Sequence, residues 1–227
     1  MTKIKSEGPA GNGIVVDNLD DRNCINNRYN GGNAMTDLYV TWDDYMAHTE
    51  RLAIKVHDHG YKFNQIVCIA KGGLRVGDII QRIFDVPLAI MSVESYHGDG
   101  VKNQQSGIVF GNSLAKTTPN LGNKVLLVDD LCDSGVTMEK CVKWLEHYHG
   151  FFIDDIKTGC LWVKGVSKFT PDFYIEYLED SPWIHQPMEE YESMGITDLK
   201  TKVVLESEAI RQQQDPRHNQ SAFKGSA

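Results

Sequence analysis

Short runs of apolar residues alternate along the middle of the chain with segments whose apolar residues recur at helical spacing. The apolar runs predict buried strands over residues 65–70, 88–96, 124–129, 158–164 and 173–178. The helical spacing predicts a helix from Thr41 to His59, a second over 74–84 and a third over 137–149. We find no internal repeat in this pattern.

Local signals mark the ends of two of these helices. Thr41 followed by Asp44 resembles a capping box, with Asp in place of the usual Glu, and predicts where the first helix begins. Gly60 is expected to end that helix, and Gly150 to end the helix over 137–149. Between the strand over 88–96 and the next one, residues 97–107 are polar and contain glycine, which predicts a loop.

Strands with apolar residues on both faces, alternating with helices, predict an α/β fold: a mostly parallel sheet covered by helices on both faces. In such sheets ligands bind at the carboxyl ends of the strands. We therefore expect the functional residues in the loops that follow the predicted strands.

Composition excludes several classes of protein. The 227 residues are 41% hydrophobic and 24% charged, with a net charge of −8, which argues against a nucleic-acid or anionic-membrane surface. No apolar run approaches the roughly 18 residues of a membrane span, and the N-terminus lacks the apolar region of a signal peptide. Five scattered cysteines without a C-x-x-C suggest reduced thiols. We expect a cytoplasmic protein.

The segment VLLVDDLCDSGVT (125–137) places Asp129, Asp130 and Asp133 directly after a predicted buried strand. Acids in this position can simply cap the next helix or face water. A receiver domain also ends a strand in paired acids that hold Mg²⁺, but there the pair lies near the start of the chain and leads directly into a helix. Here the pair lies past the middle, and a glycine-containing loop follows it.

A third interpretation follows from loop chemistry. Free backbone N–H groups at a helix N-terminus suit a phosphate dianion, and the hydroxyls of Ser134 and Thr137 add donors. Gly135 allows the backbone to approach closely. Ionised Asp129 and Asp130 only accept hydrogen bonds, which suits two neighbouring hydroxyls. Together these features predict a site for a ribose 5-phosphate.

The same segment resembles the signature of type I phosphoribosyltransferases, which bind phosphoribosyl pyrophosphate (PRPP). The resemblance extends from about residue 40 to about residue 190. It implies the type I phosphoribosyltransferase fold with a small additional hood. It implies that Asp129 and Asp130 hold the ribose hydroxyls. It also implies that the 5′-phosphate is bound by the loop of Asp133, Ser134, Gly135, Val136 and Thr137. Asp133 would in addition be the catalytic residue beside the base.

Two other segments resemble loops of this family. Lys71, Gly72 and Gly73 follow the strand over 65–70, where the family has its pyrophosphate-binding loop, and the peptide after the lysine can be cis there. Ser95 and Tyr96 match the start of the mobile loop that closes over PRPP and would exclude water from the reacting carbon.

The segment WIHQP (183–187) resembles the base-binding hood of the bacterial xanthine-guanine and hypoxanthine phosphoribosyltransferases. The resemblance implies that Trp183 stacks on a purine and that the backbone of Ile184 meets the base edge. Lys164 lies where the family places the lysine that donates to a 6-oxo group. The aromatic residue that often follows Gln-Pro in the family is here Met188, a departure from the pattern.

The resemblance therefore implies an enzyme that transfers 5-phosphoribosyl from PRPP to N9 of hypoxanthine, guanine or xanthine and releases pyrophosphate. Mg²⁺ is the implied cofactor, with Asp129 and Asp130 as its protein ligands together with Glu189, although Glu190 is an alternative. PRPP, a purine base and further copies of the chain in a dimer or tetramer are the expected partners. A PRPP- or nucleotide-binding regulator and a pyrimidine phosphoribosyltransferase stay open as alternatives.

The domain organisation that follows has four parts. We expect a loose N-terminal extension over 1–38, rich in Gly and Asn, and the phosphoribosyltransferase core over 39–178. The hood and base-binding segment would occupy 179–202, and a C-terminal tail 203–227.

Overall fold

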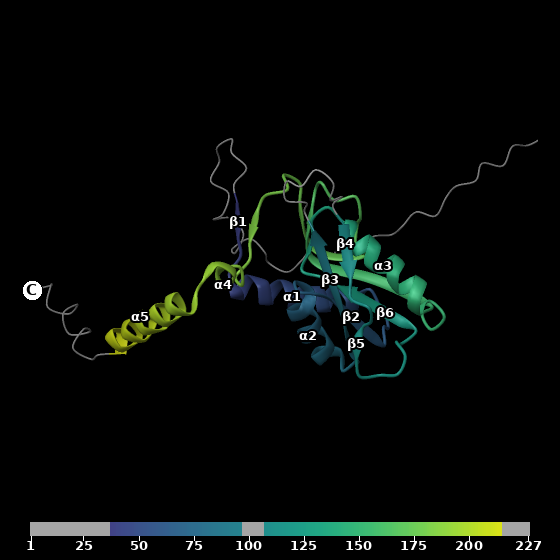
Figure 1. Ribbon diagram of the computed structural model, residues 1–227, viewed down its shortest axis with the longest axis horizontal. Helices are drawn as coiled ribbons and strands as arrows, with labels where there is room; N and C mark the ends of the chain where they lie inside the picture. The colour runs from purple at the N-terminus through teal and green to yellow at the C-terminus, as the bar shows by residue number, and fades with distance from the viewer. Residues whose placement is uncertain (1–36, 97–106, 215–227) are drawn as a thin grey trace, which may run out of the picture. The chain divides into compact units, whose positions relative to one another are not determined.

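The computed structural model of the protein describes residues 37–96 and 107–214 (Figure 1). For Ser95, Tyr96, Ala209 and residues 212–214 it describes the backbone alone. The predicted N-terminal extension therefore lies outside the described residues except for its last two positions, as does most of the predicted loop over 97–107.

Strands and helices alternate over residues 38–96, as the apolar pattern predicts, and runs of consecutive strands lie on either side of the helix over 136–149. The strands are β1 (Leu38–Tyr39), β2 (Gln65–Ala70), β3 (Leu88–Tyr96), β4 (Gly107–Phe110), β5 (Ala115–Lys116), β6 (Lys124–Val128), β7 (Leu131–Cys132), β8 (Asp155–Lys164), β9 (Phe173–Leu178) and β10 (Ile184–His185). The helices are α1 (Trp42–Asp58), α2 (Gly73–Phe84), α3 (Val136–His149), α4 (Glu190–Ser193) and α5 (Ile196–Gln214).

The predicted helix boundaries are confirmed at α1. The Thr41 hydroxyl accepts a hydrogen bond from the Asp44 N–H at 3.2 Å, and the Asp44 carboxylate accepts one from the Thr41 N–H at 3.0 Å. This is the reciprocal capping box. Beyond the C-cap residue His59, Gly60 has a φ of 79°, a left-handed conformation that ends the helix.

The main sheet is mostly parallel, which confirms the predicted fold class. Strands β3, β2, β6 and β8 pair in parallel in that order, and β9 pairs in parallel with β8. The short strands β4 and β5 pair antiparallel with β3. Because the central strands are parallel, the loops that follow β2, β6 and β8 emerge at the same edge of the sheet.

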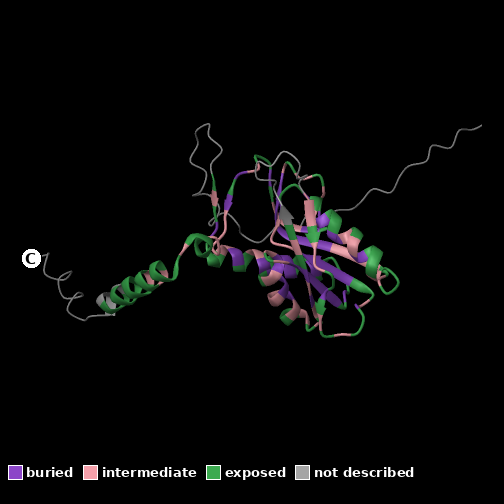
Figure 2. Cartoon of the chain, viewed as in Figure 1, coloured by how far each residue is buried: buried purple, intermediate pink, exposed green. Residues whose placement is uncertain are grey.

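Helices cover both faces of this sheet, with α1 and α2 on one side and α3 on the other (Figure 1). Neighbouring strand residues point to opposite faces: Ile66 and Cys68 pack towards α1 and α2, whereas Val67 and Ile69 pack towards α3. Figure 2 shows the buried residues concentrated in the sheet, with exposed residues on the outer sides of the helices.

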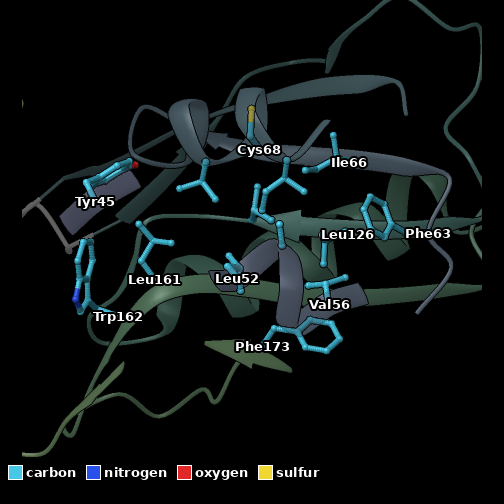
Figure 3. Close-up of a cluster of buried hydrophobic side chains, with 14 of the residues drawn as sticks. Tyr45, Leu52, Val56, Phe63, Ile66, Cys68, Leu126, Leu161, Trp162 and Phe173 are labelled. Atoms are coloured by element: carbon cyan, nitrogen blue, oxygen red, sulfur yellow. The ribbon is translucent and has the colours of Figure 1, made fainter. Parts of the chain in front are cut away.

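Figure 3 shows the core on the α1 side. Leu52 and Val56 of α1 meet Leu126 of β6 and Leu161 of β8, and all four side chains are fully buried. Trp162 lies at one end of this cluster, and its indole N–H donates to the Glu176 carboxylate at 3.1 Å. The dry core holds the carboxyl ends of β6 and β8 in a defined register, which positions the loops that follow them.

A second, two-stranded sheet pairs β1 with β10 in parallel. The predicted hood thus includes β10, but its partner strand comes from residues 38–39, next to the start of the predicted core. We missed β1 because two residues carry too little pattern to predict a strand. Helix α5 was also missed; it runs across the boundary predicted at residues 202 and 203, and its apolar residues are largely exposed.

Within residues 37–96 and 107–214, no helix combines the length and the apolar character that crossing a bilayer demands.

Candidate functional site

Asp129 and Asp130 lie in a break between two strands. Strand β6 pairs with β8 up to Val128, opposite Gly159, and β7 resumes pairing with β8 at Leu131, opposite Trp162. The residue offset is the same on both sides of the break, so β7 continues the line of β6. The Asp130 carbonyl keeps a link to β8 by accepting the Leu161 N–H at 2.9 Å. The sheet therefore holds both acids at fixed positions.

The carboxylate of Asp129 accepts hydrogen bonds from the backbone. Asp129 accepts a hydrogen bond from the backbone N–H of Asp130 at 3.0 Å and another from the N–H of Gly73. Burial, followed by repulsion from Asp130, raises the pKa of Asp129 well above its ordinary value. A positive group or a hydrogen-bond donor at this place would stabilise the ionised pair.

The turn that follows these acids leads into α3, as predicted. The first backbone hydrogen bond of α3 runs from the Glu139 N–H to the Gly135 carbonyl at 3.1 Å. The N–H groups of Thr137 and Met138 therefore have no acceptor inside the helix. Ser134 is exposed beside them. This is the arrangement that binds phosphate at helix N-termini.

Gly135 occupies a position that no other residue fits well. Its φ is 78°, and a Cβ there would lie 2.6 Å from the Ser167 hydroxyl and 2.6 Å from the Cβ of Phe169. The segment after β8 thus packs directly on the turn, and the Lys168 N–H donates to the Ser134 carbonyl at 3.1 Å. Residues 167–169 therefore pack against residues 134–137, which we call the phosphate-type turn, and stabilise its conformation.

The loop of Lys71, Gly72 and Gly73 packs against the two acids. A Cβ on Gly72 would lie 2.2 Å from Oδ1 of Asp130, and one on Gly73 would lie 2.5 Å from the Val128 carbonyl. A side chain on Gly73 would collide with backbone, and one on Gly72 would displace the Asp130 carboxylate, so glycine at both positions permits this close packing. The structure therefore brings together two loops that are more than 50 residues apart in the chain, and the exposed Lys71 lies at their junction.

This loop contains a cis peptide bond, between Ala70 and Lys71. The family resemblance implied a cis bond after the lysine, so that expectation was wrong by one residue. The bond precedes Lys71 and lies where β2 ends.

Lys164, Asp133 and Trp183 meet at the other end of the site. Lys164 is the last residue of β8 and is buried, and its Nζ lies 3.3 Å from Oδ1 of the exposed Asp133. The same Nζ lies 5.6 Å from the ring centroid of Trp183, whose side chain is 61% exposed. A large aromatic surface that remains open to solvent beside a buried cation can stack on a planar ligand.

Ile184 buries its side chain and leaves part of its backbone available. The carbonyls of Trp183 and His185 accept the N–H groups of Leu38 and Val40, at 2.7 and 3.0 Å. Successive carbonyls of a strand point to opposite edges, so the Ile184 carbonyl is directed away from β1. This backbone can meet a ligand edge.

Gln186 makes a contact within the site that the sequence pattern did not reveal. Its Nε2 donates to Oδ2 of Asp130 at 2.7 Å, which joins the hood to the acid pair. The Gln-Pro of the hood motif was noticed in the sequence, but spacing alone does not show that its side chain reaches a residue 56 positions earlier.

Ser95 and Tyr96 close β3, where they pair with Ile108 and Gly107 of β4. Their side chains and residues 97–106 lie outside the description, so their part in a closing loop stays a prediction.

The predicted metal ligands are divided between two places. Asp129 and Asp130 are adjacent, whereas Glu189 lies beside His185, with 3.8 Å between its Oε2 and Nδ1 of the ring. Glu190 forms an ion pair with Lys202 of α5 at 2.8 Å. Among the described residues, no three His, Cys, Asp or Glu side chains are grouped as a metal site. Two carboxylates fit Mg²⁺ if substrate oxygens and water complete the coordination.

A hollow of about 580 Å³ opens on the other side of β10, next to α4 and the start of α1. Tyr39, Trp42, His185 and Glu189 line it, and the ring of Tyr39 stacks on that of His185 with centroids 4.3 Å apart. Trp183 and Lys164 are not among its lining residues, but Gln186 is, so the hollow adjoins the acid pair through this side chain.

The amino-acid sequence of the chain matches a known protein family. Residues 37–193 match the phosphoribosyl transferase domain, which includes both loops, Lys164 and the hood. The chain belongs to this family.

Three proteins of known name are similar to this chain. It is 31% identical over 108 residues to the xanthine-guanine phosphoribosyltransferase of Ruegeria sp. (strain TM1040), covering 45% of this chain and 61% of that one. A purine phosphoribosyltransferase from Pyrococcus horikoshii is 26% identical with a TM-score of 0.56, over 66% of this chain and 92% of the other. The Helicobacter pylori xanthine-guanine-hypoxanthine phosphoribosyltransferase shares the fold at 20% identity and a TM-score of 0.56, over 73% and 99%.

Proposed function

We propose that the protein transfers the 5-phosphoribosyl group of PRPP to N9 of a 6-oxopurine and releases pyrophosphate. The observation that carries the proposal is the meeting of four parts at one edge of the sheet: an acid pair, a phosphate-type turn, a glycine loop with a lysine, and a buried lysine beside an exposed tryptophan. The names of the relatives with 31% and 26% identity support a purine substrate.

In this proposal the ribose 5-phosphate end of PRPP lies on the acid loop. The N–H groups at the start of α3 and the hydroxyls of Ser134 and Thr137 bind the 5′-phosphate. Asp129 and Asp130 accept hydrogen bonds from the two ribose hydroxyls. Lys71 and the backbone of Gly72 and Gly73 bind the pyrophosphate.

The base end combines stacking with an edge contact. Trp183 stacks on the purine, and Lys164 donates to the 6-oxo group; a lysine cannot accept a hydrogen bond from the 6-amino group of adenine. In the tautomer of a free 6-oxopurine that carries its proton on N7, the N7–H donates a hydrogen bond and the neighbouring 6-oxo group accepts one. The 3.3 Å between Lys164 and Asp133 suits two groups that contact these neighbouring atoms.

The transfer step breaks one bond to C1 of the ribose and forms another. The bond between C1 of the ribose and the pyrophosphate oxygen breaks, and its electron pair leaves with pyrophosphate. The lone pair of N9 forms the new bond to C1 from the opposite face, and Asp133 accepts the proton that leaves N7. Lys71 and the loop N–H groups stabilise the charge that develops on pyrophosphate. Mg²⁺, when bound with the help of Asp129 and Asp130, would neutralise part of that charge, and Glu189 is its proposed third ligand.

Several broader expectations belong to the same proposal. A cytoplasmic location and the absence of a nucleic-acid partner fit the net charge of −8, whereas a dimer or tetramer as the working form is proposed from the family resemblance. Size-exclusion chromatography with light scattering measures the assembly state.

The test is a turnover assay with PRPP, Mg²⁺ and five bases: hypoxanthine, guanine, xanthine, adenine and orotate. We expect turnover with at least one 6-oxopurine and pyrophosphate in equal amount. Preference for orotate would favour a pyrimidine phosphoribosyltransferase and defeat the role of Lys164. PRPP binding without turnover on any base would favour a regulator.

A further inference from the structure

The hood touches the acid loop through the side chain of Gln186. The hydrogen bond from its Nε2 to Oδ2 of Asp130 measures 2.7 Å, which is short for an amide donor and typical of a charged acceptor. Gln186 follows β10 by one residue, so the group that meets Asp130 belongs to the segment that carries Trp183 and Ile184.

Asp130 is held from two sides. Its Oδ1 lies against Gly72, so closely that a Cβ there would be 2.2 Å away, while Oδ2 accepts the amide of Gln186. The hydrogen bond from the hood and the close packing of the glycine loop both restrict the orientation of this carboxylate. Without Gln186 it could rotate about its side-chain bonds and lose part of its alignment.

Gln186 itself is fixed by its own backbone. Its carbonyl accepts the N–H of Glu189 at 3.0 Å, and the preceding residue, His185, accepts the N–H of Val40 at 3.0 Å. The amide orientation follows from its acceptor, because a carboxylate can only accept a hydrogen bond. Oε1 of Gln186 is buried and has no hydrogen-bond partner within the described chain. The side chain thus keeps its contact with Asp130 although one of its atoms is unsatisfied.

We propose that Gln186 is a positioning residue for ribose recognition: it orients the Asp130 carboxylate for a ribose hydroxyl from a segment that otherwise serves the base. This inference rests on the proposed function, because it assumes that Asp130 binds the ribose. It assigns a role to the Gln of the hood motif that differs from base binding.

The experiment measures the binding of ribose 5-phosphate and of guanosine monophosphate by calorimetry, in the wild-type protein and in Gln186→Leu. Loss of a hydrogen bond to a charged group should weaken both ligands by about the same factor, on the order of tenfold. The ratio between the two affinities, which reports the contribution of the base, should stay as in the wild type. Gln81→Leu, on α2 and away from the loops, is the matched control and should bind like the wild type.

A purely structural role of Gln186 would change the ratio between the two affinities. If loss of Gln186 displaced the whole hood, the affinity ratio would fall as well, and the inference would be overturned. Equal binding of ribose 5-phosphate by Gln186→Leu and the wild type would also overturn it. Gln186→Glu keeps the length of the side chain but places a second carboxylate against Asp130, and it should weaken ribose 5-phosphate at least as much. If the wild type binds neither ligand, the proposed function itself fails.

Discussion

The ammonium group of Lys164 lies 3.3 Å from the carboxylate of Asp133 and joins the end of β8 to the turn that precedes α3. Lys164 is buried and Asp133 is exposed, so the pair joins the interior of the protein to its surface at this end of the candidate site. A buried lysine needs a charged or polar partner, and Asp133 supplies it in the absence of a base. Both residues can then face a ligand without large movement.

Replacement of Asp133 by asparagine tests its role as proton acceptor. Asparagine is similar in size and can still accept a hydrogen bond from Lys164, but it is a poor base. We expect turnover to fall by about 10²-fold or more, with the KM for PRPP nearly unchanged. Steady-state kinetics measure both quantities, and Asp180→Asn, an exposed position after β9, is the control. Turnover near that of the wild type would remove Asp133 from the mechanism.

Replacement of Lys164 by methionine removes the donor to the 6-oxo group and keeps much of the side-chain volume. We expect kcat/KM for the preferred 6-oxopurine to fall about 10- to 100-fold, since a charged hydrogen bond is lost. Lys124→Met, at the opposite end of β6, should leave kcat/KM unchanged. If Lys164→Met uses 6-oxopurines as well as the wild type does, the assignment of base specificity to this residue is wrong.

Gly135 and Gly60 form a matched pair for testing the phosphate-type turn. Both have φ near 78°, but a Cβ on Gly60 meets nothing within 4 Å, whereas one on Gly135 meets Ser167 and Phe169 at 2.6 Å. Gly60→Ala should lower the free energy of unfolding by about 1 kcal/mol through backbone strain alone. Gly135→Ala should lower it by at least about 2 kcal/mol, because the steric overlap adds to the strain. Urea unfolding measures both, and equal losses would show that the packing of residues 167–169 on the turn is not tight.

Glu176 gives the protein a pH-dependent contribution to stability. Its hydrogen bond from His48 at 3.3 Å is the main cause that lowers the pKa of Glu176 below its ordinary value, and Trp162 adds a further donor. A carboxylate whose folded pKa is lowered stabilises the protein above the unfolded pKa, and this contribution is lost as the pH falls through the folded pKa.

We therefore expect the free energy of unfolding to drop more steeply in the wild type than in Glu176→Gln between about pH 5.5 and about pH 3.5. Urea unfolding at both pH values measures the difference. The exposed Glu179→Gln should keep the wild-type slope. An identical slope in Glu176→Gln and the wild type would show that this carboxylate makes no net contribution.

Strong local patterns allowed much of the fold to be predicted. Largely apolar runs predicted β2, β3, β6 and the apolar part of β8, because strands covered on both faces have few polar positions. Strand β8 begins three residues earlier than expected, at Asp155, since its first residues are mixed in polarity. Helix α5 was missed because its apolar residues do not form one clear face, and much of their surface stays exposed.

The sequence by itself determined the main strands and helices, the capping box of α1 and the positions of the two loops that follow β2 and β6, because each depends on residues close together in the chain. Only the tertiary structure decided that Gly72 approaches Asp130, that Lys164 pairs with Asp133 and that Gln186 reaches the acid pair. These contacts join residues from separate loops, and their distances depend on the register of the parallel strands and on the packing beneath them. Local pattern carries no information on either, since the same loops on a sheet of another register would not meet.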